Sequence, residues 1–284
     1  MAVKYWLLAT RPKTLTAALC PVLLGLSIAT ELGPIDVTFS VITLLCAILI
    51  QIGTNFANDY FDFKKGGDSP GRIGPQRMVQ AGHITETQMK RATIITLSCA
   101  FLFGLLLVYK AGWPILIIGI ISIICAVLYT GSPFSLAYTG TADLFVLAFF
   151  GPIAVMGTVF IQSTTWSLDA FYLGLGLGAI ATALLVVNNV RDYTEDKKNN
   201  KKTIVVRLGQ LFGKLEYSLC IMVSYAVVFT QSLNQQDLAL IIILGALSAY
   251  MISQIWIKKE KELNTLLAQI GLFLISYTIC LILI

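Results

Sequence analysis

Long apolar runs recur along this chain and leave few folds open to it. Hydrophobic residues make up 57% of its 284 residues and charged residues only 12%, which excludes an ordinary soluble domain. Runs of about 17 to 25 residues, the length at which a helix spans a bilayer, lie at 14–32, 37–60, 90–109, 113–130, 142–162, 169–190, 214–231, 237–257 and 263–284. We therefore predict an all-α polytopic membrane protein, a single domain over 1–284 in which nine transmembrane helices form a bundle around a cytoplasm-facing cavity.

The basic residues are distributed very unevenly between the two sides of such a bundle. Nine spans place the termini on opposite sides, and of the 20 Lys and Arg residues only Lys110 then falls on the C-terminal side. Basic residues gather on the cytoplasmic side of membrane proteins. We therefore predict a bacterial inner-membrane protein with a cytoplasmic N-terminus and its C-terminus on the opposite side. This topology explains the net charge of +5 without a nucleic-acid partner, and the partner we expect is membrane lipid.

The second apolar run ends in a stripe of acidic and amide side chains. On a helix Asn55, Asp59 and Asp62 fall at i, i+4 and i+7, so these side chains share one face, and Asn58 lies beside them. Such a stripe can bind a metal ion at the membrane edge. It can equally be an ordinary polar helix end.

A matching stripe follows the sixth run, where Asn188, Asp192 and Asp196 recur every four residues. Two such stripes on one side of the membrane favour a shared site. Mg²⁺ usually takes one or two protein carboxylates and completes its shell with phosphate oxygens and water. We therefore predict a diphosphate held between the stripes by Mg²⁺, which would stabilise a departing pyrophosphate. The predicted catalytic and metal-binding residues are Asp59, Asp62, Asp192 and Asp196, assisted by Asn55, Asn58 and Asn188.

Basic side chains in the two cytoplasmic loops can complete such a site, because arginine binds phosphate oxygens bidentately and lysine adds a point charge. The predicted diphosphate-binding residues are Arg72, Arg77, Lys202 and Arg207. Asp68 is a further assisting candidate, in a loop rich in Gly and Pro that is long enough to fold over the site. We assign to water or lipid headgroups the charges of Lys64, Lys65, Lys197 and Lys198.

Two features of the apolar runs concern packing and carry no chemistry. Gly174, Gly178 and Thr182 place small residues at four-residue intervals and predict close contact with a neighbouring helix. Pro21 and Pro152 lie inside the first and fifth runs, where each removes a backbone hydrogen bond and favours a kink.

The motifs together resemble a known family. Asn58-Asp59-x-x-Asp62 and Asp192-x-x-x-Asp196 are similar to the two aspartate-rich motifs of the UbiA superfamily of intramembrane prenyltransferases, and nine spans match its architecture. Other segments resemble the 1,4-dihydroxy-2-naphthoate polyprenyltransferase branch: Arg11-Pro12-Lys13-Thr14, Arg72-Ile73-Gly74-Pro75-x-Arg77, Tyr129-Thr130-Gly131-Ser132-Pro133 and Val206-Arg207-Leu208-Gly209. Ser132 departs from that pattern, in which glycine is expected.

This resemblance implies an enzyme of menaquinone biosynthesis. It would transfer a polyprenyl group from polyprenyl diphosphate to 1,4-dihydroxy-2-naphthoate with Mg²⁺ and loss of CO₂, giving demethylmenaquinol. Tyr129 and Asn188 are the acceptor-binding candidates. One alternative is a prenyltransferase for another acceptor, such as 4-hydroxybenzoate. The other is a transporter for divalent cations or anionic metabolites, which would require polar residues to continue through the membrane.

Overall fold

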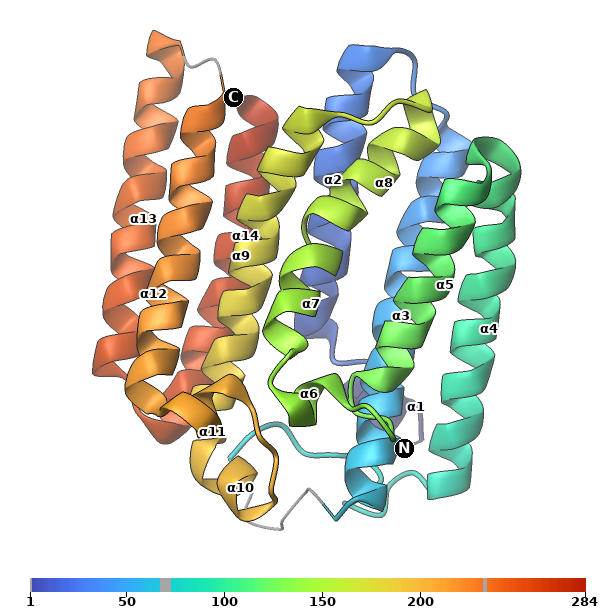
Figure 1. The fold of residues 1–284 in the computed structure, drawn as a ribbon, viewed down its shortest axis with the longest axis vertical. Coiled ribbons are helices and arrows are strands. Elements are labelled where there is room, and N and C mark those ends of the chain that lie inside the picture. Colours follow the sequence, from blue (N-terminus) through green and yellow to red (C-terminus); the bar gives the residue numbers. More distant parts are fainter. Residues whose placement is uncertain (1, 67–72, 232–233) are drawn as a thin grey trace.

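The computed structural model describes residues 2–66, 73–231 and 234–284. Those residues form helices joined by short segments and contain no strand (Figure 1). The α-helices are α1 Ala2–Ala9, α2 Leu15–Leu32, α3 Val37–Lys64, α4 Glu86–Ala111, α5 Trp113–Leu128, α6 Leu136–Thr139, α7 Ala142–Phe149, α8 Pro152–Ser163, α9 Leu168–Arg191, α10 Tyr193–Lys198, α11 Ile204–Leu208, α12 Gln210–Val227, α13 Leu238–Ile257 and α14 Leu263–Leu283.

The helices bear out an integral membrane protein, with one span fewer than predicted. Within the described residues, 8 helical segments are long and apolar enough to cross a membrane, and α5 is a shorter apolar helix of 16 residues. At 1.5 Å per residue, a helix of that length covers about 24 Å, less than the ~30 Å hydrocarbon core. The prediction of an all-α bundle is therefore confirmed. The one predicted span that is too short in the structure is the run at 113–130, which forms α5.

Several helices begin where the sequence supplies a capping group. Asp36 Oδ1 accepts hydrogen bonds from the Thr38 and Phe39 backbone N–H groups at the start of α3. Thr85 and Gln88 form a capping box at the start of α4. These side chains satisfy backbone donors that a helix start leaves without partners.

The fifth predicted run is divided into α7 and α8 rather than kinked within one helix. Pro152 begins α8, where its missing N–H costs nothing. A Cβ added at Gly151 would lie 2.5 Å from the Gly174 carbonyl oxygen, and one added at Gly178 would collide with the Leu147 carbonyl oxygen. The glycine stripe of α9 therefore packs closely on the α7–α8 junction, as its spacing predicted.

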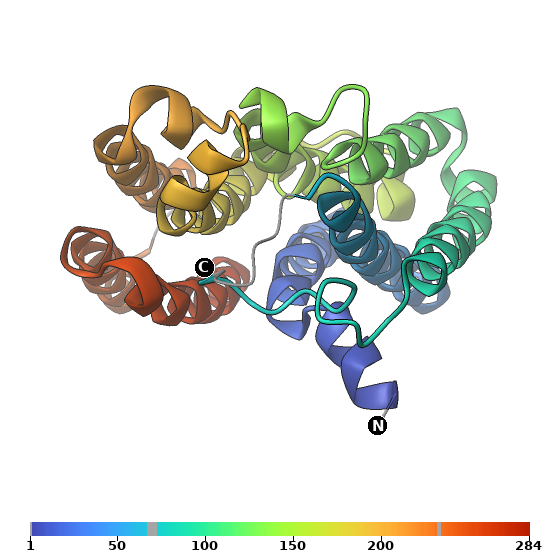
Figure 2. The same cartoon turned by 90° about the horizontal axis from the view of Figure 1, so that it is seen from below.

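The two ends of the bundle differ in what they carry. Figure 1 places the N-terminus at the same end as α10 and α11, and the C-terminus at the opposite end. Figure 2, which looks along the helices from below, shows α10, α11 and the described part of the α3–α4 connection together at the near end. Because α3 and α9 both end there, the fold brings the two aspartate motifs to one end of the bundle.

Candidate active site

The first aspartate motif occupies the last turns of α3, where its polar side chains are buried. Asn55 Nδ2 donates to the Thr10 carbonyl oxygen at 2.8 Å and to Thr14 Oγ1 at 3.0 Å. Asn58 Oδ1 accepts a hydrogen bond of 2.9 Å from Thr130 Oγ1. The two amides therefore fasten α3 to the α1–α2 turn and to the segment after α5, which holds the carboxylates of the motif in position.

The segment that follows the first motif folds back over its two carboxylates. Asp59 accepts hydrogen bonds from the backbone N–H groups of Met78 at 2.9 Å and Val79 at 3.2 Å. Asp62 forms a buried ion pair with Arg77, with 2.5 Å between Oδ2 and Nη2. Tyr138 Oη also donates to Asp62, at 3.4 Å. The described part of this loop therefore covers the first motif.

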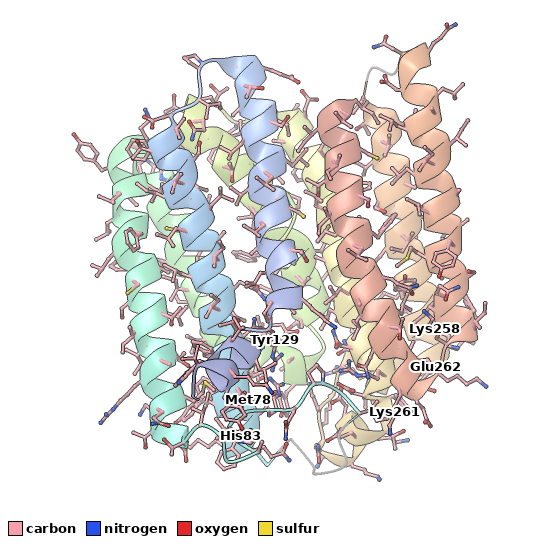
Figure 3. The ribbon with its side chains drawn as sticks, turned by 180° about the vertical axis from the view of Figure 1, so that it is seen from behind. Met78, His83, Tyr129, Lys258, Lys261 and Glu262 are labelled. Atoms are coloured by element: carbon pink, nitrogen blue, oxygen red, sulfur yellow. The ribbon has the colours of Figure 1, made fainter. Side chains whose placement is uncertain are left out.

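α1 supports the covering segment from outside. The Tyr5 ring stacks on the His83 ring with 3.9 Å between their centroids, and Trp6 packs edge-on against Phe56 of α3. Figure 3 labels Met78 and His83 at this end of the bundle, close to one another. The short N-terminal helix and the loop therefore pack as one layer over the end of α3.

The second motif lies where α9 passes into the short helix α10. Asp192 directly follows α9 and accepts two hydrogen bonds of 2.7 Å from the neighbouring Arg191 guanidinium. Asp196 is buried on α10, with its Oδ1 atom 3.4 Å from Lys201 Nζ. Asn188, one turn earlier on α9, donates to the Leu184 carbonyl oxygen at 2.9 Å.

A chain of hydrogen bonds joins the second motif to the loop of the first. Arg191 Nη1 donates to Asn264 Oδ1 at 2.9 Å, and Asn264 Nδ2 donates to the Ile73 carbonyl oxygen at 3.2 Å. Asn264 lies on α14, so three distant parts of the sequence meet here. The second motif and the loop that covers the first are therefore connected through Asn264.

The predicted diphosphate-binding residues have different surroundings. Arg77 contacts Asp62, as described. Arg207 donates to the Lys202 carbonyl oxygen at 3.1 Å and to the Thr139 carbonyl oxygen at 2.8 Å, and the Lys202 side chain is exposed. Arg72, like the assisting candidate Asp68, lies outside the described residues. Arg77 thus directly contacts an aspartate of the first motif.

Lys65 is exposed, in keeping with its assignment to water or lipid headgroups, and its side chain also reaches the site. Its Nζ atom donates to the Thr130 carbonyl oxygen at 2.5 Å and lies 4.2 Å from the centre of the Tyr138 ring. Lys201 lies over the same ring at 5.9 Å. Burial lowers the pKa of the Lys65 ammonium group, against the opposing effect of Asp62. Two cations therefore stand beside Tyr138, which itself contacts the first motif.

Arg11 was not among the predicted site residues, although its Arg-Pro-Lys-Thr segment was noted. It adopts a left-handed backbone conformation with φ of 51°, which is uncommon for a residue other than glycine and often marks a functional position. Its carbonyl oxygen accepts bonds from the Thr14 N–H and hydroxyl groups. Its guanidinium lies within electrostatic range of Asp59 and Tyr129.

The donor atoms of the motifs suit a hard cation such as Mg²⁺, which prefers oxygen ligands. Among the described residues no three His, Cys, Asp or Glu side chains form one metal-binding group. Each motif can thus supply one or two carboxylates, and the remaining ligands would come from phosphate oxygens and water. That division is the one Mg²⁺ usually adopts with phosphate substrates.

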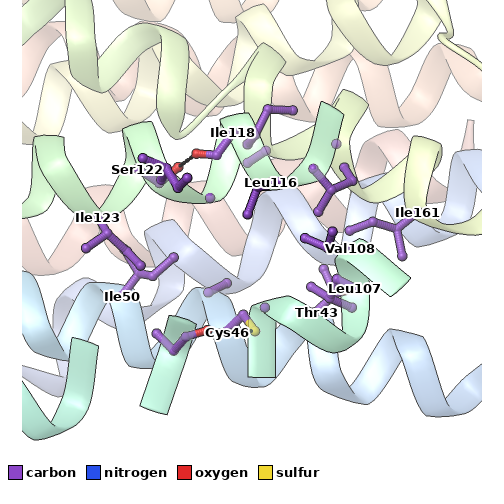
Figure 4. Close-up of a pocket in the computed structure, with 18 of the residues that line it drawn as sticks. Thr43, Cys46, Ile50, Leu107, Val108, Leu116, Ile118, Ser122, Ile123 and Ile161 are labelled. Carbon is purple, nitrogen blue, oxygen red and sulfur yellow. Dashed lines mark hydrogen bonds between the residues drawn. The ribbon is translucent and has the colours of Figure 1, made fainter. Parts of the chain in front are cut away.

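An apolar pocket lies deeper in the bundle, among α2, α3, α4, α5 and α8 (Figure 4). Its lining reaches Ile50 of α3, and nine residues of helix put this position about 13.5 Å below Asp59. The lining hydroxyl groups of Thr43, Ser122 and Thr158 each donate to the carbonyl oxygen four residues earlier. With these donors already satisfied, the pocket presents an almost wholly apolar surface.

The chain matches one protein family over most of its length. The sequence pattern of the UbiA prenyltransferase family covers residues 18–277. The chain belongs to this family. Two solved structures of UbiA homologs resemble this structure. Their sequence identity to this chain is low, so the resemblance concerns the fold alone. A UbiA homolog from Archaeoglobus fulgidus bound to GPP and Mg²⁺ has a TM-score of 0.68 at 16% identity, covering 99% of this chain and 100% of that chain.

The second solved UbiA homolog, from Aeropyrum pernix K1, has a TM-score of 0.72 at 12% identity, covering 93% of this chain and 96% of that chain. Two UbiA relatives are more similar in sequence, and both are 1,4-dihydroxy-2-naphthoate octaprenyltransferases. The Escherichia coli protein is 40% identical over 228 residues, 78% of this chain and 74% of that protein. The Haemophilus influenzae protein is 32% identical over 286 residues, 95% and 92% of the two proteins.

Proposed function

We propose that this UbiA protein transfers a polyprenyl group from its diphosphate to 1,4-dihydroxy-2-naphthoate in menaquinone biosynthesis. The observation that carries the proposal is the pairing of two buried aspartate motifs at one end of the bundle with an apolar pocket below them. The octaprenyltransferases of Escherichia coli and Haemophilus influenzae support the choice of acceptor.

The motifs would hold the diphosphate end of the donor. Asp59, Asp62, Asp192 and Asp196 would bind Mg²⁺, which neutralises charge on the departing pyrophosphate when it is bound. Asn55 and Asn58 hydrogen-bond Thr10 and Thr130 and so hold the end of α3 against the neighbouring segments. Arg77 already lies at the first motif, so a small movement could bring its guanidinium from Asp62 to a phosphate oxygen. Arg207, Lys202 and Arg72 remain candidates for further phosphate contacts.

The apolar pocket would hold the isoprenoid tail. Its lining residue on α3 nearest to the first motif, Ile50, lies about 13.5 Å along the helix from Asp59, so a prenyl chain whose diphosphate lies at Asp59 would have to be long enough to cover that distance. The hydroxyl groups that line the pocket are already hydrogen-bonded within the protein. The hydrophobic effect therefore favours burial of the apolar tail there. An apolar wall also shields a developing allylic cation from water, which would otherwise capture it.

The acceptor would react at the ring carbon that bears its carboxylate. A bond forms from that carbon to C1 of the prenyl group while the C1–O bond to diphosphate breaks. Loss of CO₂ then leaves its bonding electron pair in the ring and restores aromaticity. Tyr129 and Asn188 remain candidates for contact with the acceptor, because both lie near the space between the motifs.

Two other functions remain as alternatives to be tested. A different acceptor such as 4-hydroxybenzoate would use the same donor site. A transporter for cations or anionic metabolites would need a polar path to the far side, whereas the pocket found here is apolar. We further propose that the protein lies in a bacterial inner membrane with its motifs and N-terminus facing the cytoplasm, as the distribution of basic residues indicates.

An acceptor competition assay tests the proposed function. Purified protein with Mg²⁺ and one prenyl diphosphate is given equal amounts of 1,4-dihydroxy-2-naphthoate and 4-hydroxybenzoate. We expect prenylated product from the naphthoate alone. Preferential prenylation of 4-hydroxybenzoate would reject the acceptor, and cation or metabolite flux in vesicles without any prenylated product would reject the enzyme class.

A further inference from the structure

The short helix α1 has an inner face that packs on the protein and an outer face that does not. Tyr5, Trp6 and Ala9 pack against α3 and against the covering segment, residues 77–84. The outer face carries four exposed side chains, those of Val3, Lys4, Leu7 and Leu8. Three of these four are apolar. A surface helix in water carries polar groups on its outer face, so the outer face of α1 indicates another environment.

α1 does not continue straight into the first membrane span. The apolar segment Val3–Leu32 is long enough to be counted as one span. The backbone turns at Arg11, however, which has a left-handed conformation with φ of 51°, and α2 starts only at Leu15. The 18 residues of α2 suffice to span a bilayer without α1. Figure 2 shows α1 extending outward from the bundle, with the N-terminus beyond the other helices.

The contact of α1 with α3 places α1 at the level of the membrane interface. Trp6 packs against Phe56 with 5.6 Å between their ring centroids. At 1.5 Å per residue, the part of α3 from Val37 to Phe56 is about 28.5 Å long. Asp36 and Lys110 pair at 3.9 Å just before Val37, which marks the opposite interface. Because the hydrocarbon core is about 30 Å thick, α3 leaves it close to Phe56, where α1 lies.

We propose that the outer face of α1 binds the lipid bilayer at this interface, and that this contact holds the covering segment on Asp59. Leu7 and Leu8 insert among the upper parts of the acyl chains, and the Lys4 ammonium group lies among anionic headgroups. The hydrophobic effect favours this position, because the alternative environment of the two leucines is water. The bilayer that surrounds α2 and α3 extends to α1, so it can cover this face without a further protein.

The inner face of α1 connects the lipid contact to the first aspartate motif. Ala9 of α1 lies in one buried apolar cluster with the Met78 and Val79 side chains of the covering segment. The backbone N–H groups of the same two residues donate hydrogen bonds to Asp59. A helix that is anchored in the bilayer on one face and packed on this segment with the other restricts the movement of both. The lipid contact therefore stabilises the position of the Asp59 carboxylate.

Amide hydrogen exchange in nanodiscs that hold one copy of the protein tests the proposal. Leu7→Ser removes an apolar side chain from the outer face of α1 and leaves the inner face unchanged. We expect the amides of α1 and those of Met78 and Val79 to exchange about 10-fold faster, the factor for loss of one buried leucine side chain. Unchanged exchange in α1 would overturn the lipid contact. Faster exchange in α1 alone would overturn its support of the covering segment.

Lys4→Gln distinguishes a lipid surface from a protein partner. In nanodiscs that contain phosphatidylglycerol, the α1 amides of this variant should exchange about 5-fold faster than those of the wild type, the factor for one lysine at an anionic surface. In phosphatidylcholine alone the two proteins should exchange alike. An effect in both lipids, or in neither, would overturn the proposal. So would slow exchange of α1 that requires two copies in one nanodisc, since a second chain would then cover the face.

Leu211→Ser is the matched control. Leu211 is 64% exposed, close to the 61% of Leu7, and it lies in the first turn of α12, at the same end of the bundle as α1. We expect the amides of α1, Met78 and Val79 to exchange in this variant as in the wild type. Equal acceleration by the two serine variants would overturn the proposal in favour of a general loosening of the bundle. No prenyl transfer is measured, so the outcome is independent of the proposed function.

Discussion

The ion pair between Arg77 and Asp62 allows a quantitative test of how the first motif is built. Both side chains are almost fully buried, at 6% and 7% exposed, so solvent screens the pair little. Arg77→Met keeps most of the aliphatic volume but leaves the Asp62 carboxylate without its cation. Removing one partner of a buried pair costs about 3 to 5 kcal/mol. We expect a value near the lower end, because the Tyr138 hydroxyl still donates to Asp62.

Mg²⁺ should restore part of this loss if Asp62 is a metal ligand. A ligand that binds only the folded state adds RT ln(1 + [L]/Kd), about 2.7 kcal/mol at a concentration of 100 Kd. Reversible unfolding in detergent, measured with EDTA and with excess Mg²⁺, gives both quantities for the wild type and Arg77→Met. The variant should gain more from Mg²⁺ than the wild type, since the ion no longer competes with a guanidinium for Asp62.

The exposed Arg91 of α4 supplies the control for this experiment. Arg91→Met removes the same charge from an exposed side chain and should change stability by no more than about 0.5 kcal/mol. The reasoning would be refuted by an Arg77→Met variant as stable as the wild type in EDTA. It would be refuted equally by a gain from Mg²⁺ that is the same in the two proteins.

Three further predictions concern activity. Alanine at Asp59 or at Asp192 should lower prenyl transfer at least about 100-fold, the scale for loss of transition-state charge stabilisation, while membrane insertion measured by fractionation is unchanged; near-normal turnover would exclude a metal role. EDTA should abolish transfer and Mg²⁺ should restore it, and persistence of activity in the chelator would contradict a divalent-ion requirement. Gly157→Leu would fill the apolar pocket, where an added Cβ would meet only Ile118 Cδ1, at 3.9 Å. The kcat/KM for long prenyl diphosphates should then fall relative to that for geranyl diphosphate. An equal effect on both substrates would argue against a tail site there.

Periodicity in the sequence was enough to predict the helices and the placement of the motifs. Asn55, Asp59 and Asp62 share a helix face because their spacing matches the turn of an α-helix. The bias of basic residues predicted that both motifs lie at one end, and the structure places them there. The same reasoning predicted the close packing at Gly174 and Gly178, since small residues one turn apart allow two backbones to approach.

Contacts between distant segments could not be predicted in this way. Nothing in the local pattern indicates that Asn264 joins Arg191 to Ile73, because those residues come together only through the packing of α9 and α14. The break at Gly151 and Pro152 was missed because the apolar run continues through it without change. The contacts of Lys65 with Thr130 and Tyr138 were not predicted, because its charge follows a helix end like any interfacial lysine and only the fold brings these residues to it.

The stoichiometry of CO₂ release tests the central claim most directly. Purified protein with Mg²⁺ is given a prenyl diphosphate and 1,4-dihydroxy-2-naphthoate labelled with ¹³C in its carboxylate. The account predicts one labelled CO₂ for each prenylated ring, and neither product in the Asp59→Ala variant. Prenylated product that retains its labelled carboxylate, or the absence of prenyl transfer to the naphthoate, would contradict it.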